Sequence, residues 1–340
     1  MKTAANSPLL AVKELETKFF GAGREFTAVG KISFNLERGE FLAVVGESGS
    51  GKSVTALSIL RLMPPQGRIT GGQVIFDGED LLHLPGQALR QIRGNRIAMI
   101  FQEPMTSLNP VLTIGDQIVE ALVVHKTVGR RAAREQAIEL LRRVQIPLPE
   151  ERIDDYPHRL SGGMRQRAMI AMALSCEPDI LIADEPTTAL DVTVQAQILD
   201  LLKRLQAEYQ MAMILITHDL GIVRDCADRV VVMYGGKIVE EGCVTDTLAT
   251  TAHPYTQMLV DIARNLEGEN RRAPRRNAGA PFQQNGQRSG CNFYGRCPEH
   301  VAVCRDHEPP QVRLTSEHCV WCFNRTSAPT FGGKGQQCSS

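Results

Sequence analysis

A glycine-rich segment near the N-terminus carries the residue types that bind phosphate groups. Residues 46–53 read Gly-Glu-Ser-Gly-Ser-Gly-Lys-Ser and match the P-loop spacing G-x-x-x-x-G-K-[ST]. Glycines let backbone N–H groups converge on phosphate oxygens, and the N-terminus of a following helix adds a favourable dipole. We expect Lys52 to contact the β- and γ-phosphates of a nucleotide, and the Ser53 hydroxyl to bind Mg²⁺. The other expected contacts come from Gly46, Ser48, Gly49, Ser50 and Gly51.

A second segment places two carboxylates at the end of an apolar run. The run 180–183 predicts a buried strand, and Asp184 and Glu185 follow it directly. Asp184 is suited to hold the Mg²⁺ shell, and Glu185 is close enough to accept a proton from an attacking water. Acidic residues after strands are common on surfaces, so this segment is a weak signal alone. Together with residues 46–53 it predicts nucleotide hydrolysis.

Both segments require a sheet that brings strand ends together. The fully apolar run 41–45 predicts a buried strand before the glycine-rich segment, and residues 54–63 predict a helix that Pro64 and Pro65 terminate. Later, apolar strands alternate with amphipathic helices, which is typical of a parallel α/β sheet. We expect strands at 180–183, 212–216 and 230–234, and helices at 194–209 and 220–226.

The rest of the chain divides by pattern and composition. Short β-like runs occur before residue 40 and between 71 and 101, and the pattern is helical from about 113 to 172. Residues 265–290 are rich in Arg, Asn, Gln, Gly and Pro and predict a linker, and residues 326–340 predict a disordered tail.

Composition and charge exclude several classes of protein. Lys plus Arg and Asp plus Glu are both 38, so a zero net charge argues against a protein that mainly coats nucleic acid or an anionic membrane. Apolar runs are far shorter than a membrane span needs, and the N-terminus lacks a secretory signal. We therefore expect a cytosolic chain that does not cross a bilayer by itself. Nine cysteines in such a chain argue against a disulfide framework.

Further motifs follow in an order that resembles the nucleotide-binding subunits of ABC transporters. Leu160-Ser161-Gly162-Gly163 resembles the ABC signature, which in that family contacts the ATP held by the opposite subunit through a Ser hydroxyl and Gly amides. The remaining matches are Gln102 as the Q-loop glutamine, Asp191 in the D-loop, and His218 as the switch histidine. The resemblance implies that Gln102 contacts Mg²⁺ or water and that His218 touches the γ-phosphate. The family also stacks adenine on an aromatic side chain upstream of the P-loop, for which Phe19 aligns best, with Phe20 and Phe26 as alternatives.

The resemblance narrows to the dipeptide/oligopeptide (nickel) importer branch. Residues 102–110, 183–192 and 253–256 carry that likeness. It implies a RecA-like P-loop core with an antiparallel β subdomain at 8–255, a helical subdomain inserted at about 103–168, and a C-terminal extension at 256–325. It also implies an ATPase at the cytoplasmic face of the inner membrane. Its expected partners are a paralogous second ATPase subunit, two transmembrane permease subunits and, indirectly, a solute-binding protein.

A group of cysteines near the C-terminus resembles the cysteine module of that branch. In some members four such cysteines bind a [4Fe–4S] cluster, and aligning His318 with the family histidine places the fourth ligand at Cys322 rather than Cys319. The implied ligands are Cys291, Cys297, Cys304 and Cys322. Zinc is the alternative metal because four cysteines suit both, and a metal-free reduced segment is a third possibility.

Other functions are compatible with parts of the pattern. The same ATPase can serve nickel, glutathione, haem or an opine-like solute, because specificity resides in other subunits. A soluble ABC protein acting on ribosomes or DNA usually has two cassettes or a long coiled-coil insertion, and neither is visible here. A regulatory module that holds ATP without hydrolysing it is disfavoured by the intact Lys52, Asp184, Glu185 and His218.

Overall fold

The computed structural model describes residues 7–21, 23–102, 107–188, 190–266 and 289–325. These residues fall into two compact units. The first contains residues up to 36, residues 41–82 and the chain from 216 onward, and the second contains residues 37–40 and 83–215. The domains expected from the sequence, 8–255 and 256–325, divide the chain at other positions than these two units, and they remain predictions. The expected linker and tail lie almost wholly outside the described residues.

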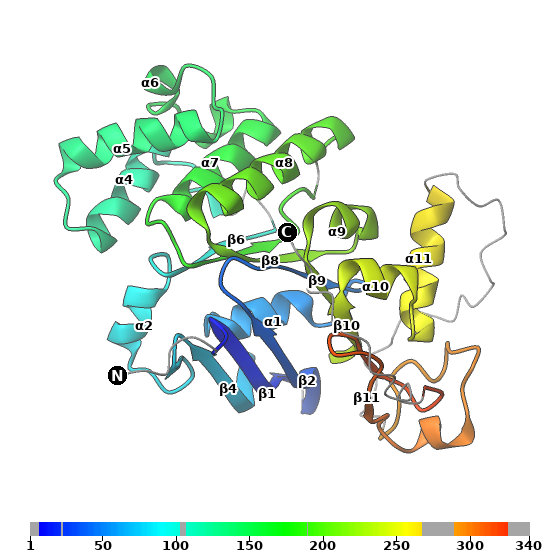
Figure 1. The fold of residues 1–340 in the computed structure, drawn as a ribbon. Coiled ribbons are helices and arrows are strands. Elements are labelled where there is room, and N and C mark those ends of the chain that lie inside the picture. The colour runs from blue at the N-terminus through cyan, green and yellow to red at the C-terminus, as the bar shows by residue number, and fades with distance from the viewer. Residues whose placement is uncertain (1–6, 22, 103–106, 189, 267–288, 326–340) are drawn as a thin grey trace. The chain divides into compact units, whose positions relative to one another are not determined.

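An antiparallel sheet opens the first unit, in the order β2-β1-β4-β5. The long central strand β1 pairs on one side with β2 and on the other with β4 (Figure 1). Leu10, Val12 and Leu15 of β1 are buried and supply its packed face. The β-like runs before residue 40 are therefore two strands much longer than their apolar cores suggested. The bounds are β1 Leu10–Gly21, β2 Arg24–Leu36, β4 Gly67–Phe76 and β5 Glu79–Asp80.

A second group of strands in the first unit has the order β11-β12-β10-β9-β3. Strands β3 and β9 are parallel and fully buried or nearly so, as continuous apolar runs predict. The other pairs in this group are antiparallel, which the alternating pattern did not predict. The strands are β3 Phe41–Val45, β9 Arg229–Tyr234, β10 Lys237–Cys243, β11 Gln311–Arg313 and β12 Cys319–Trp321.

The first helix of the first unit begins inside the glycine-rich segment, at Lys52. Helix α1 covers Lys52–Ile59, shorter than the expected helix at 54–63 and shifted toward the N-terminus. Three tyrosine and phenylalanine rings, Tyr234, Tyr255 and Phe293, pack together at the centre of the later part, with ring centroids 4.6–5.4 Å apart. The remaining helices are α9 Leu220–Cys226, α10 Val244–Ala249, α11 Pro254–Leu266 and the 3₁₀ turn η2 Ala302–Arg305.

The second unit contains the parallel strands expected around residue 180. Strand β7 (Ile180–Asp184) pairs in parallel with β6 (Ile97–Ile100), and its other neighbour is β8 (Ala212–Thr217). Every residue of β7 is buried, in agreement with its apolar sequence. Helices gather beyond the strands in the green part of Figure 1. The helices of this unit are α2 Gly86–Ile92, α4 Ile114–His125, α5 Arg130–Arg143, α6 Pro149–Arg152, η1 Pro157–Arg159, α7 Gly162–Leu174 and α8 Val192–Tyr209.

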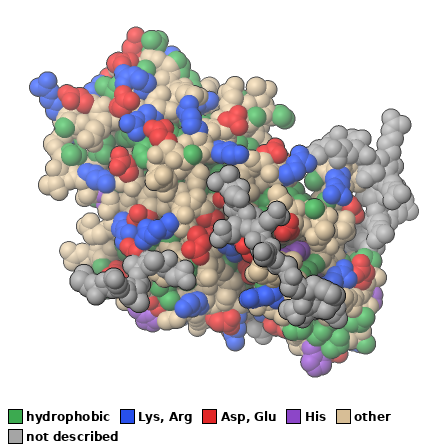
Figure 2. Space-filling view, in the orientation of Figure 1, with side chains coloured by type: hydrophobic (Ala, Val, Ile, Leu, Met, Phe, Trp, Pro, Cys, Tyr) green, Lys and Arg blue, Asp and Glu red, His purple; other side chains and the backbone are tan. Residues whose placement is uncertain are grey.

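The surface agrees with the balanced charge of the chain. Acidic and basic side chains are interspersed over the face in Figure 2, and Lys plus Arg equals Asp plus Glu at 38 each. Among the described residues, no helix is both long and apolar enough to cross a membrane.

Candidate phosphate site and cysteine pocket

The glycine-rich segment 46–53 forms a tight loop between β3 and α1. The ammonium group of Lys52 lies over this loop, where it donates to the carbonyl oxygens of Gly46 at 2.7 Å and Glu47 at 3.0 Å. The lysine side chain is buried, and Ser50 beside it is buried too. A positive charge is thus held at the concave side of a loop at a helix N-terminus, which is the arrangement that binds phosphate groups.

Two glycines of this loop have no room for a side chain. Gly46 has a φ of 155°, and a Cβ there would lie 2.2 Å from the carbonyl oxygen of Met233. Gly51 has a φ of 102°, and its Cβ would lie 2.5 Å from the carbonyl oxygen of Ala28. Because backbone atoms of β9 and β2 pack this closely, any residue larger than glycine would displace the loop.

The carboxylate of Glu185 is held by two donors in the second unit. Gln102 donates through Nε2 to Glu185 Oε2 at 3.1 Å, and the Thr188 hydroxyl donates to the same oxygen at 3.0 Å. Glu185 has a left-handed backbone, with a φ of 45°, immediately after β7. Asp184, the last residue of β7, is buried. The structure thus brings together Gln102 and Glu185, which lie 83 residues apart. Glu103–Thr106 of the Q-loop motif lie outside the described residues.

The Ser-Gly-Gly segment at 161–163 starts helix α7. The Ser161 hydroxyl caps this helix by accepting from the backbone N–H of Met164 at 3.3 Å. A Cβ on Gly163 would lie 2.8 Å from a methyl group of Val194 in α8, so this glycine permits close packing of the two helix starts. Asp191 caps α8 by accepting from the N–H of Val194 at 2.9 Å. The expected signature and D-loop residues therefore lie side by side, although Ala189 is outside the described residues.

The other two predicted nucleotide contacts lie in the first unit. His218 is exposed and directly follows β8, just before Asp219, which caps helix α9. Phe19 is half-buried in β1, opposite Phe26 of β2, and its ring touches the position of Gly67 in β4. Phe20 is exposed beneath the guanidinium of Arg68. These contacts do not decide among the three phenylalanines.

The four cysteines expected as ligands line one small pocket. Cys291, Cys297, Cys304 and Cys322 all border it, together with His253 and Pro254 at the start of α11. Cys319 is not among its lining residues; it lies on β12, buried beside β10. All four are free thiols.

Burial and mutual proximity raise the pKa of three of these thiols, Cys291, Cys297 and Cys322. Burial is the main cause for Cys297, whose pKa rises to about 11, and the neighbouring Cys291 and Cys322 contribute. The pKa values of Cys291 and Cys322 are raised for the same reason, with Cys304 as a neighbour of both. Within the described ranges, however, no three His, Cys, Asp or Glu side chains are grouped closely enough to hold one metal ion.

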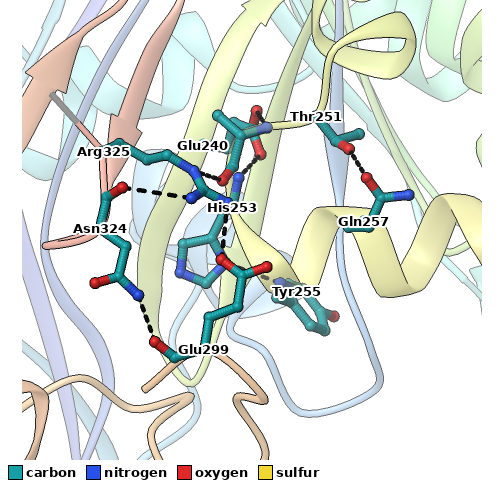
Figure 3. Close-up of polar contacts among 9 residues, drawn as sticks. Glu240, Thr251, His253, Tyr255, Gln257, Glu299, Asn324 and Arg325 are labelled. Carbon is teal, nitrogen blue, oxygen red and sulfur yellow. Dashed lines mark hydrogen bonds and ion pairs between the residues drawn. The ribbon is translucent and has the colours of Figure 1, made fainter. Parts of the chain in front are cut away.

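A buried carboxylate attaches the cysteine segment to the rest of its unit. Glu240 of β10 is fully buried and accepts from the backbone N–H groups of Ala252 and His253 at 2.7 and 2.8 Å, and from His318 at 2.8 Å. Figure 3 shows this carboxylate beside the loop that enters α11. His253 in turn accepts from the N–H of Tyr255 through Nδ1. His318 is thus a structural partner of Glu240.

The C-terminal end of the described chain closes the same region. Arg325 donates to the carbonyl of Ala252 at 2.6 Å and pairs with Glu299 at 3.1 Å, and Asn324 donates to the carbonyl of Glu299 (Figure 3). Strand β12 pairs with β10 through Glu240 and Glu241. The segment after residue 289 therefore completes an existing sheet through β12.

Sequence reasoning missed a contact between the cysteine segment and the phosphate loop. Arg296 donates to both carboxylate oxygens of Glu47, at 2.7 and 2.9 Å. The N–H of Glu47 also donates to the hydroxyl of Tyr255 at 2.7 Å. A lone glutamate at a variable position of the P-loop pattern and an arginine 249 residues later carry no sequence signal that links them.

Comparisons with known proteins agree with this geometry. The family model described as "ABC transporter" matches residues 29–188, and the one described as "Oligopeptide/dipeptide transporter, C-terminal region" matches residues 239–304. A probable peptide ABC transporter ATP-binding protein of Sinorhizobium fredii is 51% identical over 317 residues, 93% of this chain and 94% of the relative. The dipeptide transport ATP-binding protein DppD of Bacillus subtilis is 48% identical over 316 residues, 93% of this chain and 94% of the relative.

Solved structures give the same likeness for the cassette. A dimeric ATP-binding cassette in a post-hydrolysis state, bound to ADP and phosphate, matches with a TM-score of 0.63 and 29% identity. That match covers 69% of this chain and 98% of the other. The cbiO1 protein of Clostridium perfringens, part of the ABC transporter complex cbiONQ, matches with a TM-score of 0.61 and 27% identity over 77% of this chain and all of the other.

Proposed function

This chain belongs to the ABC transporter family, and from that membership we propose that it is the ATP-hydrolysing subunit of an importer for di- and oligopeptides. The observation that carries the proposal is the phosphate loop, with Lys52 drawn onto its carbonyl oxygens at the start of α1. The peptide transport functions in the names of the most similar relatives, which match along nearly the whole chain, support the substrate class.

The roles of the individual residues follow from their chemistry and, for His218 and Phe19, from the resemblance to the family. The P-loop backbone and Lys52 hold the phosphates, Ser53 and Gln102 serve as ligands of Mg²⁺, and Asp184 orients its shell. Glu185 accepts the proton of the attacking water, and His218 contacts the γ-phosphate. When bound there, Mg²⁺ would supply positive charge against the phosphate oxygens. Phe19 provides the platform for adenine.

Assembly with a second ATPase completes each site. The chain has one P-loop and one Ser-Gly-Gly signature, and the cap of α7 by Ser161 leaves a helix N-terminus suited to an anion from another subunit. The matched cassette structures include dimers. A paralogous second ATPase subunit therefore supplies the opposite signature. The pair drives two membrane permease subunits from the cytoplasmic face, with solute delivered by a binding protein.

The test of this function uses the assembled transporter. Glu185→Gln is expected to keep ATP affinity within about twofold while it lowers turnover at least a hundredfold, because only the proton acceptor is lost. The measurements are ATP binding, ATP hydrolysis, and uptake of labelled dipeptides into vesicles. Glu208→Gln, an exposed residue of α8, is the matched control and should keep both activities.

Two results would contradict the assignment. Hydrolysis at the wild-type rate in Glu185→Gln would show that another group accepts the proton. ATP-driven uptake of nickel, glutathione or haem, without uptake of any di- or oligopeptide, would leave the ATPase assignment standing but show that the substrate class is wrong.

For the cysteine pocket, the chemistry of the four thiols fits a [4Fe–4S] cluster held by Cys291, Cys297, Cys304 and Cys322. Such a cluster cross-links a segment with few large aliphatic residues. Protein purified without oxygen should contain about four iron and four sulfide per chain. Cys304→Ser should lose the iron, and Cys319→Ser should retain it, since Cys319 does not border the pocket. Colourless protein that contains one zinc per chain would show that the pocket binds zinc and not an iron–sulfur cluster.

A further inference from the structure

Two side chains from the C-terminal third of the chain hold the second residue of the phosphate loop. Arg296 binds both carboxylate oxygens of Glu47 in a fork, at 2.7 and 2.9 Å. Tyr255, the second residue of α11, accepts the backbone N–H of the same Glu47 at 2.7 Å. Glu47 is therefore restrained through both its side chain and its backbone, at a point five residues before Lys52.

Arg296 is itself held rigidly. Its side chain is only 13% exposed, and its guanidinium lies 5.7 Å from the ring centre of Tyr234 and 5.8 Å from that of Phe293. It also donates to the Tyr234 hydroxyl at 3.3 Å. The hydrogen bonds to Glu47 raise the pKa of Arg296 further above its usual range. An arginine packed in this way has few other rotamers available. A movement of its backbone is therefore passed on to the Glu47 carboxylate that it binds.

The other end of this connection is a wall of the cysteine pocket. Arg296 directly precedes Cys297, and the N–H of Cys297 donates to the carbonyl of Phe293 at 3.0 Å. Phe293 packs on Tyr255, and the loop before it contains Cys291. A displacement of this turn therefore moves Arg296, and with it the carboxylate of Glu47.

We propose that Arg296 is a positioning residue of the phosphate loop, which couples nucleotide binding to the state of the cysteine pocket. The inference rests on the proposed function only in requiring that the loop binds a nucleotide. Two effects of losing Arg296 act in the same direction. The Glu47 carboxylate is left uncompensated beside a site for a polyanion, and the loop loses its lateral restraint. Because coupling between sites is reciprocal, a bound nucleotide also stabilises the pocket.

The first experiment measures the ATP dissociation constant of the full chain. Arg296→Gln should raise it at least about fivefold, the lower end of typical couplings between sites. Arg296→Lys should give an intermediate value, because lysine keeps the charge and loses the fork. Arg305→Gln is the matched control, since Arg305 is an exposed residue of the same segment. An unchanged ATP dissociation constant in Arg296→Gln would overturn the proposal. If Arg296→Gln does not fold, equal ATP dissociation constants for Arg296→Lys and wild type would overturn it.

The second experiment measures deuterium labelling of the backbone amides of residues 291–297, located by peptide mass spectrometry. ATP should slow their labelling at least about threefold in wild type and in Arg305→Gln, and should have no effect in Arg296→Gln. A merely structural role for Arg296 would change labelling without changing its dependence on ATP. Equal labelling of wild type with and without ATP would sink the coupling. If wild type binds no ATP at all, the proposed function fails instead, so the two failures are distinguishable.

Discussion

At the scale of single residues, the backbone of Glu185 has an unusual conformation for a non-glycine residue. Its φ of 45° follows a strand that is buried at every position. Such conformations persist only where surrounding contacts enforce them, and they occur often at functional sites. Here the carboxylate oxygen Oε2 accepts from both Gln102 and Thr188. Two donors on one oxygen define the direction in which the carboxylate faces.

Thr188 is therefore expected to position the proton acceptor. Thr188→Val should lower kcat of the assembled ATPase about three- to tenfold with little change in KM, because one hydrogen bond of ordinary strength is lost and nucleotide binding is untouched. Thr188→Ser should restore most of the rate, since it keeps the hydroxyl. A rate in Thr188→Val equal to wild type, measured by phosphate release, would show that Gln102 alone is sufficient.

At the scale of elements, strand β12 and helix α11 meet at the buried carboxylate of Glu240. Three donors surround it: the N–H groups of Ala252 and His253, and the ring of His318. A buried charge is tolerated only when its hydrogen-bonding capacity is used, as it is here. The contact joins two segments that are 78 residues apart and holds the cysteine segment to the sheet.

Protonation of His253 is expected to weaken this junction in acid. Burial lowers its pKa from 6.5 to about 4, although Glu240 partly opposes the shift. Between these two values the unfolded chain binds more protons than the folded one, so stability falls as the pH falls from about 6.5 to 4, by at most about 3 kcal/mol. Above 6.5 this residue makes no pH-dependent contribution.

Thermal unfolding at several pH values tests this expectation. His253→Asn keeps an acceptor for the N–H of Tyr255 and removes the titration, so its loss of stability between pH 6.5 and 4.5 should be clearly smaller than that of wild type. His158→Asn, an exposed histidine of η1, should behave as wild type. Parallel pH dependence in wild type and His253→Asn would refute the assignment.

At the scale of the whole molecule, the expected catalytic unit contains two ATPase chains. Ser161→Arg should reduce hydrolysis by the assembled complex at least tenfold, because a bulky cation replaces the hydroxyl that we propose contacts the partner's nucleotide. ATP binding to the P-loop of the same chain should stay within about twofold of wild type. The measurement is ATPase activity and nucleotide affinity, each in the isolated chain and in the complex.

Thr113→Arg is the control for the loss of a helix cap. Thr113 caps α4 as Ser161 caps α7, through a hydroxyl that accepts from the N–H of Asp116. Both substitutions therefore remove a helix cap and lower the stability of the fold by about 1 kcal/mol, whereas only Ser161→Arg alters the signature segment. High turnover by the isolated chain, insensitive to Ser161→Arg, would exclude a site shared between two subunits.

The sequence alone determined the family, the local elements around each motif and the chemistry of the phosphate loop. Those features depend on contiguous residues: glycines that need positive φ, a lysine at a helix start, and apolar runs that must be buried strands. The strands expected at 41–45 and 180–183 and the helix expected at 220–226 have this origin, and the structure confirms them, with the second strand extended to Asp184. The pattern could not give strand lengths in β1 and β2, because polar residues continue pairing after the apolar core ends.

Contacts between distant segments were decided by the tertiary structure. The fork between Arg296 and Glu47, the buried carboxylate of Glu240 and the pairing of β12 with β10 join segments far apart in the chain. The residues that make these contacts belong to no sequence motif and follow no periodic pattern. Such a polar residue acquires its structural role only when folding excludes water and places a partner within hydrogen-bonding distance. For that reason the cysteine segment could be recognised by its spacing, while its attachment to the phosphate loop could not.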